Sequence, residues 1–232
     1  SKTVVLSNSV SSIGNDAFYN CSRLTSITIP DSVTSIGDSA FRDCSGLTNI
    51  TIPDSVTSIG YSAFSYCSSL TSITIPDGVT SIDFYAFSDC NSLTSVIWNA
   101  KNCAGNNIYP IFYSCSQLSN ITIGENVKNI PSYLVKDCSR LTSITIPDSV
   151  TSIGDGAFYG YTKLKTVYYK GTAEQWNKIS ISSKDNYNLS DATRYYYSEN
   201  EPALNSDGTA YDGNYWHYVT DGITPVIWKK EN

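Results

Sequence analysis

The sequence predicts a β-rich solenoid of the α/β class, built from about seven coils that repeat with a period of 23 and closed by a C-terminal cap. The first observation is a repeat, because LTSITIPDSVTSIG occurs at 24–37 and again, letter for letter, at 141–154. The second is a row of six cysteines at sequence intervals of 23, with one interval of 25: Cys21, Cys44, Cys67, Cys90, Cys115 and Cys138. The third is that leucine and isoleucine recur with the same period, so each coil can complete its core only against its neighbours.

Each coil is expected to begin with a strand and to end with a short turn. Residues 26–29 alternate serine or threonine with isoleucine, which is the pattern of a strand with one buried face. Pro30 ends this strand, because proline has no N–H to donate to a sheet. Farther along, Asp38 is placed to cap a single helical or 3₁₀ turn that buries Ala40 and Phe41. Stacking these coils produces a parallel sheet.

The composition changes after residue 170, and we expect residues 1–170 to form the solenoid and residues 171–232 its cap. Eleven of the 18 tyrosines follow residue 158. Thr172 and Gln175 have the spacing of a capping box, which predicts a short helix that presents Trp176 and Ile179. Strand-like runs follow at 192–197, 214–219 and 223–228, and Asp221-Gly222 suits a tight hairpin turn between the last two. Such a cap would cover the apolar end of the last coil.

The repeating unit CSxLTSITIPDSVTSIGxxAFxx resembles the BspA-like, or treponemal-type, leucine-rich repeats of bacterial surface proteins. The shared features are Ile-Pro after the strand, the Ile-Gly pair, and Ala-Phe three residues before cysteine, over about residues 1–169. The resemblance implies a right-handed solenoid, a cell-surface or exported setting, and a role in adhesion or protein binding without catalytic residues. The chain departs from this pattern between Trp98 and Ile111, and at Val135 and Tyr161.

The composition argues against nucleic acid or membrane as a partner. The chain has a formal net charge of −6 and no cluster of lysine or arginine. Nucleic acids and anionic membranes both attract such basic clusters. No apolar run approaches the roughly 20 residues that cross a bilayer. A surface rich in serine, threonine, asparagine and tyrosine favours an extracellular or cell-surface location, with any signal or anchor outside this sequence. We expect a monomer.

Neither the cysteines nor the acidic residues predict a metal, a cofactor or an enzyme. Cysteines on neighbouring rungs lie about 4.8 Å apart and point the same way, a poor geometry for a disulfide, so we expect six reduced and buried thiols. Cys103 lies outside the row, and its state is left open. One carboxylate per coil, as at Asp31 and Asp54, supplies too few ligands for calcium. His217 is the only histidine, and no nucleophile motif is present.

We expect binding on the concave face of the solenoid, where the outward side chains of the strands lie, and at the insertion 98–112, where the repeat is broken. Loops on a rigid scaffold are where binding residues concentrate. The candidate partner-binding residues are Ser72, Thr74, Ser95, Ile97, Trp98, Lys101, Asn102, Tyr109, Asn120 and Thr122.

The sequence leaves three functions open. The first is a secreted or surface-displayed binding module that recognises a host or matrix protein or a glycan. The second is a carbohydrate-binding protein that uses Trp98, Tyr109, Tyr113 and the aromatic residues of the C-terminal segment. The third is a structural spacer that displays another domain.

Overall fold

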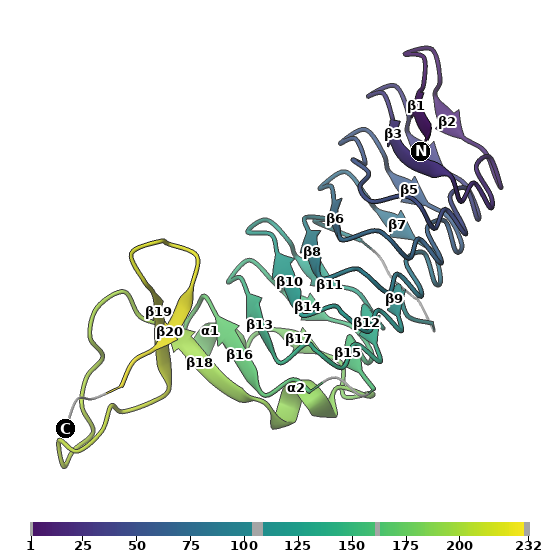
Figure 1. Cartoon of the computed structure of the whole chain (residues 1–232). Helices are drawn as coiled ribbons and strands as arrows, with labels where there is room; N and C mark the ends of the chain where they lie inside the picture. The colour runs from purple at the N-terminus through teal and green to yellow at the C-terminus, as the bar shows by residue number, and fades with distance from the viewer. Residues whose placement is uncertain (1, 104–108, 161–162, 230–232) are drawn as a thin grey trace.

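The computed structural model describes residues 2–103, 109–160 and 163–229. The chain winds through about nine turns, and each turn lies directly on the one before it (Figure 1). The prediction of a β-rich solenoid with parallel strands is confirmed, although the path is longer than seven coils. The additional turns come from the C-terminal segment, where the spacing between rungs departs from that of the repeat: Thr193 pairs with Thr166.

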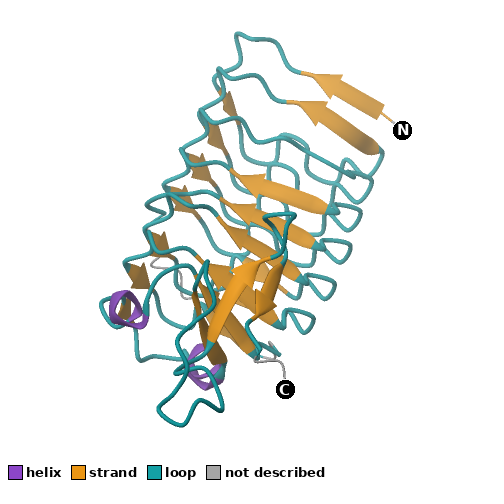
Figure 2. Cartoon of the chain, turned by 90° about the vertical axis from the view of Figure 1, so that its left-hand side faces the viewer, coloured by secondary structure: helices purple, strands orange, loops and turns teal. Residues whose placement is uncertain are grey.

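Each regular coil has three sides, and equivalent segments of successive coils pair in parallel on each side. The long strands form one side, seen as a row of arrows in Figure 2. Their sheet has the order β20-β19-β18-β16-β13-β10-β8-β6, and only β20 is antiparallel. Its strands are β6 (Ser72–Ile75), β8 (Ser95–Trp98), β10 (Asn120–Ile123), β13 (Ser143–Ile146), β16 (Thr166–Tyr169), β18 (Thr193–Tyr197), β19 (Tyr215–Tyr218) and β20 (Pro225–Ile227). At the N-terminal end, β1 (Lys2–Val5) pairs with β3 (Leu24–Thr28) on the same side.

Short strands form the other two sides. The second side contains the sheet of β2 (Ser12–Ile13), β4 (Ser35–Ile36), β5 (Ser58–Ile59) and β7 (Ser81–Ile82), and the sheet of β11 (Asn129–Ile130), β14 (Ser152–Ile153) and β17 (Ser180–Ile181). The third side contains β9 (Phe112–Tyr113), β12 (Val135–Lys136) and β15 (Phe158–Tyr159). We call the outward surface of the long strands the strand face. The turn face is the surface made by residues 38–43 and the equivalent residues of the other coils.

The core is a stack of layers with equivalent positions. Phe41, Phe64 and Phe87 are fully buried, with ring centroids 5.1 Å and 4.9 Å apart and planes within 8° of parallel. The repeated isoleucines and leucines are buried in the same way, and each recurs at its own position in successive layers. The period of the sequence is therefore the period of the core, because every apolar residue packs against its own equivalent in the next coil.

The expected helical or 3₁₀ turn around residues 38–43 is wrong, since this segment consists of tight turns. Ser39 and Asp43 have φ values of 51° and 60°, in the left-handed region, which a right-handed helical turn cannot include. The backbone N–H of Ser39 donates to Tyr61 O at 2.8 Å, and that of Phe41 donates to Ala63 O at 2.7 Å. Successive N–H groups therefore alternate: some bond to the next coil, and others close tight turns within the segment, as that of Arg42 does to Ser39 O at 3.0 Å.

The cysteine row is confirmed at five of its six positions and wrong at Cys21. All seven cysteines are free, and Cys21 is the exposed one. The Cys44 thiol donates to Phe18 O at 3.1 Å in the coil before it, and Cys67 donates to Phe41 O in the same way at 3.2 Å. Cys21 belongs to the first coil, so no earlier coil covers its thiol. Cys103 is buried, and burial raises the pKa of its thiol to about 11.

The C-terminal segment contains the predicted helix and hairpin. In α1 (Ala173–Trp176), Thr172 and Gln175 form the reciprocal capping box, and Trp176 is buried. A second helix, α2 (Tyr187–Asp191), was not anticipated by the pattern. The segment then adds β18 to the long sheet and ends in the β19–β20 hairpin. The boundary at residue 170, between the solenoid and a separate cap, stays a prediction. No helix in the described parts of the chain is long and apolar enough to cross a membrane.

Candidate functional site

Six of the ten predicted site residues lie together on the strand face. In the long sheet, Thr74 pairs with Ile97, and Ile97 pairs with Thr122. Ser72, Ser95 and Asn120 form a second row beside them, two residues earlier in each strand. Ile97 is 41% exposed, so the two rows form a polar surface with one apolar side chain in it.

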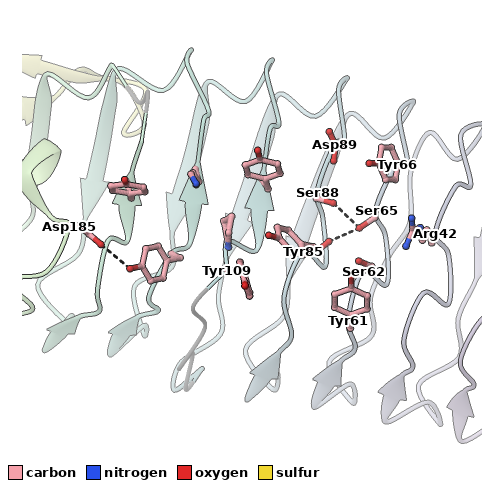
Figure 3. A pocket seen from close by; sticks show the side chains of 15 residues that line it. Arg42, Tyr61, Ser62, Ser65, Tyr66, Tyr85, Ser88, Asp89, Tyr109 and Asp185 are labelled. Atoms are coloured by element: carbon pink, nitrogen blue, oxygen red, sulfur yellow. Dashed lines mark hydrogen bonds between the residues drawn. The ribbon is translucent and has the colours of Figure 1, made fainter.

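The insertion residues do not form one patch with these rungs. Lys101 lies at the edge of the sheet, where its Nζ is 2.8 Å from Asp77 Oδ2, and Asn102 next to it is exposed. The hydrogen bond from Lys101 lowers the pKa of Asp77. Tyr109 lies on the turn face, away from the strands, where it lines a groove (Figure 3). The predicted site is therefore divided between two faces of the molecule.

Trp98 cannot contact a partner as predicted, because its side chain is fully buried. It pairs with Ile75 and Ile123 on neighbouring rungs and occupies the same inward position as they do. The indole N–H has no hydrogen-bond acceptor among the described residues. The insertion has thus placed a large ring in the core. This correction also removes Trp98 from the aromatic residues that could stack on a sugar.

The C-terminal hairpin extends the strand face into a pocket of 370 Å³. The pocket contains Asn120 and Thr122 from the predicted site, and the tip of the hairpin at residues 222–225 forms its opposite wall. Asp221 holds this tip in place, since its Oδ1 accepts from the N–H of Ile223 at 2.8 Å and from the N–H of Thr224 at 2.9 Å. Ile223 is 78% exposed beside the pocket. An exposed apolar side chain thus stands on a hydrogen-bonded turn over the polar strand face.

A lysine connects the hairpin to the sheet. Lys170 donates to Glu125, and its Nζ lies 5.1 Å from the ring centroid of Tyr218 on the hairpin. Burial lowers the pKa of Lys170, but the hydrogen bonds to Glu125 and Tyr218 outweigh this effect and raise it overall. Tyr168 forms the floor beside it, and burial raises the pKa of its hydroxyl. Both groups keep their ordinary charge at neutral pH, so the pocket presents one ion pair and neutral hydroxyls.

This arrangement is suited to binding. The described residues contain no group of three histidine, cysteine, aspartate or glutamate side chains that could hold a metal ion. The pocket lining combines amide, hydroxyl and aliphatic groups, which hydrogen-bond and pack. Lys170, Tyr218 and Ile223 were not among the predicted site residues. No local signal identifies them, because only the path of the chain through the last two turns brings the hairpin over β10 and β13.

Comparison with known proteins gives the family. The model of the BspA type leucine rich repeat region matches six copies, over residues 1–109 and 109–193. A search of curated proteins found no match.

Solved structures of bacterial leucine-rich-repeat proteins are similar to this chain. That of the leucine rich repeat protein of T. pallidum is 29% identical over 70% of this chain and 77% of that chain, with a TM-score of 0.58. A leucine-rich repeat protein from Eubacterium ventriosum is 30% identical, with 70% of this chain and 43% of that chain covered and a TM-score of 0.64. A leucine rich cell surface protein from Faecalibacterium prausnitzii is 28% identical over 78% of this chain and 63% of that chain, with a TM-score of 0.41. With its regularly stacked coils and six matched repeats, the chain belongs to the BspA-type leucine-rich-repeat family.

Proposed function

We propose that this chain is a non-catalytic binding module, secreted or displayed at a bacterial cell surface, that attaches to a host or matrix protein through the C-terminal half of its strand face. The BspA-type family supports a secreted or surface-displayed location, because the repeats of this chain resemble those of bacterial surface proteins. The observation that carries the proposal is the pocket between the sheet and the terminal hairpin, with exposed Ile223 at its rim.

The physical case rests on shape and on two apolar anchors. From β6 to β19 the seven parallel strands of the long sheet extend over roughly 29 Å at about 4.8 Å per rung, which suits a protein interface of standard size. Ile97 and Ile223 are exposed aliphatic side chains beside the hydroxyl and amide groups of the strand face. Binding energy at interfaces concentrates in a few such residues, which displace water when the partner covers them. The surrounding hydroxyl and amide groups would add hydrogen bonds and orientation.

The test is binding to a panel of immobilised, purified extracellular-matrix and serum proteins, measured by biolayer interferometry. For a protein that binds, we expect Ile97→Asp and Ile223→Asp each to weaken the affinity about tenfold or more. The reason is that the bound partner would bury an unpaired carboxylate, at a cost of about 1.4 kcal/mol or more. Val5→Asp is the matched control, because Val5 is a 73% exposed aliphatic residue on β1, at the far end of the solenoid. A panel without any bound protein, or equal losses in all three variants, would contradict the proposal.

A further inference from the structure

The turn face carries a hollow that the strand-face proposal does not use, a groove of 520 Å³ (Figure 3). It runs along the solenoid from Arg42 to Tyr159. These two residues occupy the same position in their coils, five coils apart, so the groove is roughly 24 Å long at about 4.8 Å per rung. Its walls come from the positions marked x in the repeating unit, which are free to vary because they lie outside the core.

Tyrosine rings line this groove in succession. The ring of Tyr85 lies 6.5 Å from that of Tyr61 and 5.8 Å from that of Tyr113, measured between centroids. Lys136 continues the row, with its Nζ 5.7 Å from the centroid of Tyr113 and 5.4 Å from that of Tyr159. Three successive coils thus each contribute one tyrosine ring, and neighbouring rings stand edge-to-face, with their planes 77° and 67° apart.

Three tyrosines of the groove lining, Tyr85 of this row together with Tyr66 and Tyr133, have a backbone conformation that tyrosine rarely adopts. The φ values are 60° at Tyr66, 57° at Tyr85 and 49° at Tyr133. Equivalent positions in other coils are held by serine or aspartate, such as Ser39 and Asp43. A bulky residue with left-handed φ is strained. The left-handed φ belongs to the turn of the repeat, since Asp16 and Asn20 outside the groove share it, and the groove carries tyrosine at three of these positions.

The floor of the groove is built from hydroxyl groups. Ser62, Ser65 and Ser88 are buried polar residues of its lining. Ser65 Oγ donates to Tyr85 O at 2.7 Å, and it lies 2.9 Å from Ser88 Oγ. Asp89 stands beside them, and burial raises the pKa of its carboxyl group, although hydrogen bonds from Ser88 and Tyr66 oppose the rise. The tyrosine surface therefore has hydrogen-bonding groups beneath it.

The charges of the groove cancel. Its lining contains two cations, Arg42 and Lys136, and two carboxylates, Asp89 and Asp185. Arg42 lies over the ring of Tyr66, 5.7 Å from the centroid, and Asp185 accepts a hydrogen bond from the Tyr133 hydroxyl at 3.0 Å. A strongly charged polymer would find as many repulsive groups as attractive ones. The groove is suited to a neutral ligand.

The backbone excludes a peptide that binds as an added strand. The turn-face N–H groups are already used between coils, for example from Ser62 to Phe84 O at 3.0 Å and from Tyr66 to Ser88 O at 2.9 Å. Strand addition needs a free edge, which this face does not offer along the groove. A proline-rich peptide also binds aromatic grooves, but its prolines have no N–H to donate to the carboxylate of Asp89. Sugar hydroxyls donate hydrogen bonds, and the flat C–H faces of sugar rings pack on aromatic rings.

From these observations we propose that the turn-face groove binds a linear, neutral polysaccharide, with successive sugar rings packed on Tyr61, Tyr85 and Tyr113 and their hydroxyls bonded to Asp89 and the serine floor. This site is separate from the strand face, so it stands or falls independently of the protein partner proposed above.

The test uses the whole chain and neutral linear hexasaccharides of glucose, xylose and mannose, with binding measured by calorimetry. We expect at least one of the three to bind, Tyr61→Ala, Tyr85→Ala and Tyr113→Ala each to weaken that binding about tenfold or more, and Tyr85→Phe to keep most of it. Tyr61 is 41% exposed, so its truncation leaves the core intact. Tyr19→Ala is the matched control, because Tyr19 is exposed and occupies the coil position of Tyr113 outside the groove. Unfolding temperatures of all variants separate lost binding from lost folding.

Three results would overturn the proposal. The first is that no hexasaccharide binds. The second is that a sulfated hexasaccharide binds more tightly than the neutral ones, which would make charge the source of recognition. The third is that decaproline binds in the same tyrosine-dependent manner while the sugars do not, which would assign the groove to a peptide. Ile223→Asp should leave sugar binding unchanged, so failure here and failure of the strand-face proposal remain distinguishable.

Discussion

At the residue scale, the chemistry of the cysteines depends on their place in the stack. Each buried thiol of the row donates to a phenylalanine carbonyl of the preceding coil, as Cys44 does to Phe18 and Cys138 does to Phe112. Burial raises the pKa of Cys44 to about 12, so the reactive thiolate is scarce at neutral pH. One cysteine per coil thus serves packing, and the first coil alone leaves its cysteine open to solvent.

We therefore expect iodoacetamide to label only Cys21 in the folded protein at about pH 8, and all seven cysteines after unfolding without reductant. The reason is that the other six thiols are buried, where the reagent cannot reach them. Intact-mass and peptide mass spectrometry give the count and the positions. Cys21→Ser is the control and should remove labelling of the folded protein. A disulfide between any two cysteines of the row, or rapid labelling of Cys67, would contradict this prediction.

At the element scale, the C-terminal segment closes the last regular coil. Its side chains complete the core there, since Trp176 and Leu189 are buried and belong to the same cluster as the repeats. Trp216 is fully buried, and its indole N–H donates to Tyr169 O at 2.9 Å. These contacts cover the apolar surface that the coil of β16 would otherwise expose, and they support the prediction that the segment is a cap.

Ending the chain after Lys170 should therefore cause aggregation or a large loss of stability. The truncated protein would expose the core-facing side of β16 and a free strand edge along it, and both promote association. Light scattering and thermal unfolding test this expectation. Ending the chain after Lys229 is the control, because it leaves the helices and the hairpin complete. A monomeric truncation with an unchanged unfolding temperature would show that residues 171–232 are not a cap.

At the scale of the whole molecule, stability is distributed along one dimension. Phe87 stacks between Phe64 and Phe112, with centroids at 4.9 Å and 5.1 Å, whereas Phe18 stacks only on Phe41 and is partly exposed. In the repeat region each coil packs its core against its neighbours, so the end coils contribute fewer core contacts than the central ones.

Phe87→Ala should lower the free energy of unfolding by about 3–5 kcal/mol, and Phe18→Ala by clearly less, because only the first leaves a closed cavity. Urea unfolding followed by tryptophan fluorescence measures both, since Trp98 and Trp216 are buried. Ala86→Ser is the control, because it changes a neighbouring residue of the same core layer and keeps the phenylalanine ring. Equal losses for the two phenylalanine variants would mean that the solenoid does not behave as a stack with weaker ends.

The sequence by itself determined the solenoid, its period and its buried rows, because in a repeat protein each residue packs against its own equivalent in the next coil. Two further signals are present in it. The alternation that buries Ile75 also indicates a buried Trp98, and the tyrosines at variable positions of successive coils mark the groove. Only the tertiary structure decided the tight turns in place of helical ones, the exposure of Cys21, and the pocket under the hairpin. The turns depend on hydrogen bonds between coils, the exposure of Cys21 on its place at the end of the stack, and the pocket on the return of the hairpin over earlier rungs. No single local pattern of the sequence encodes any of them.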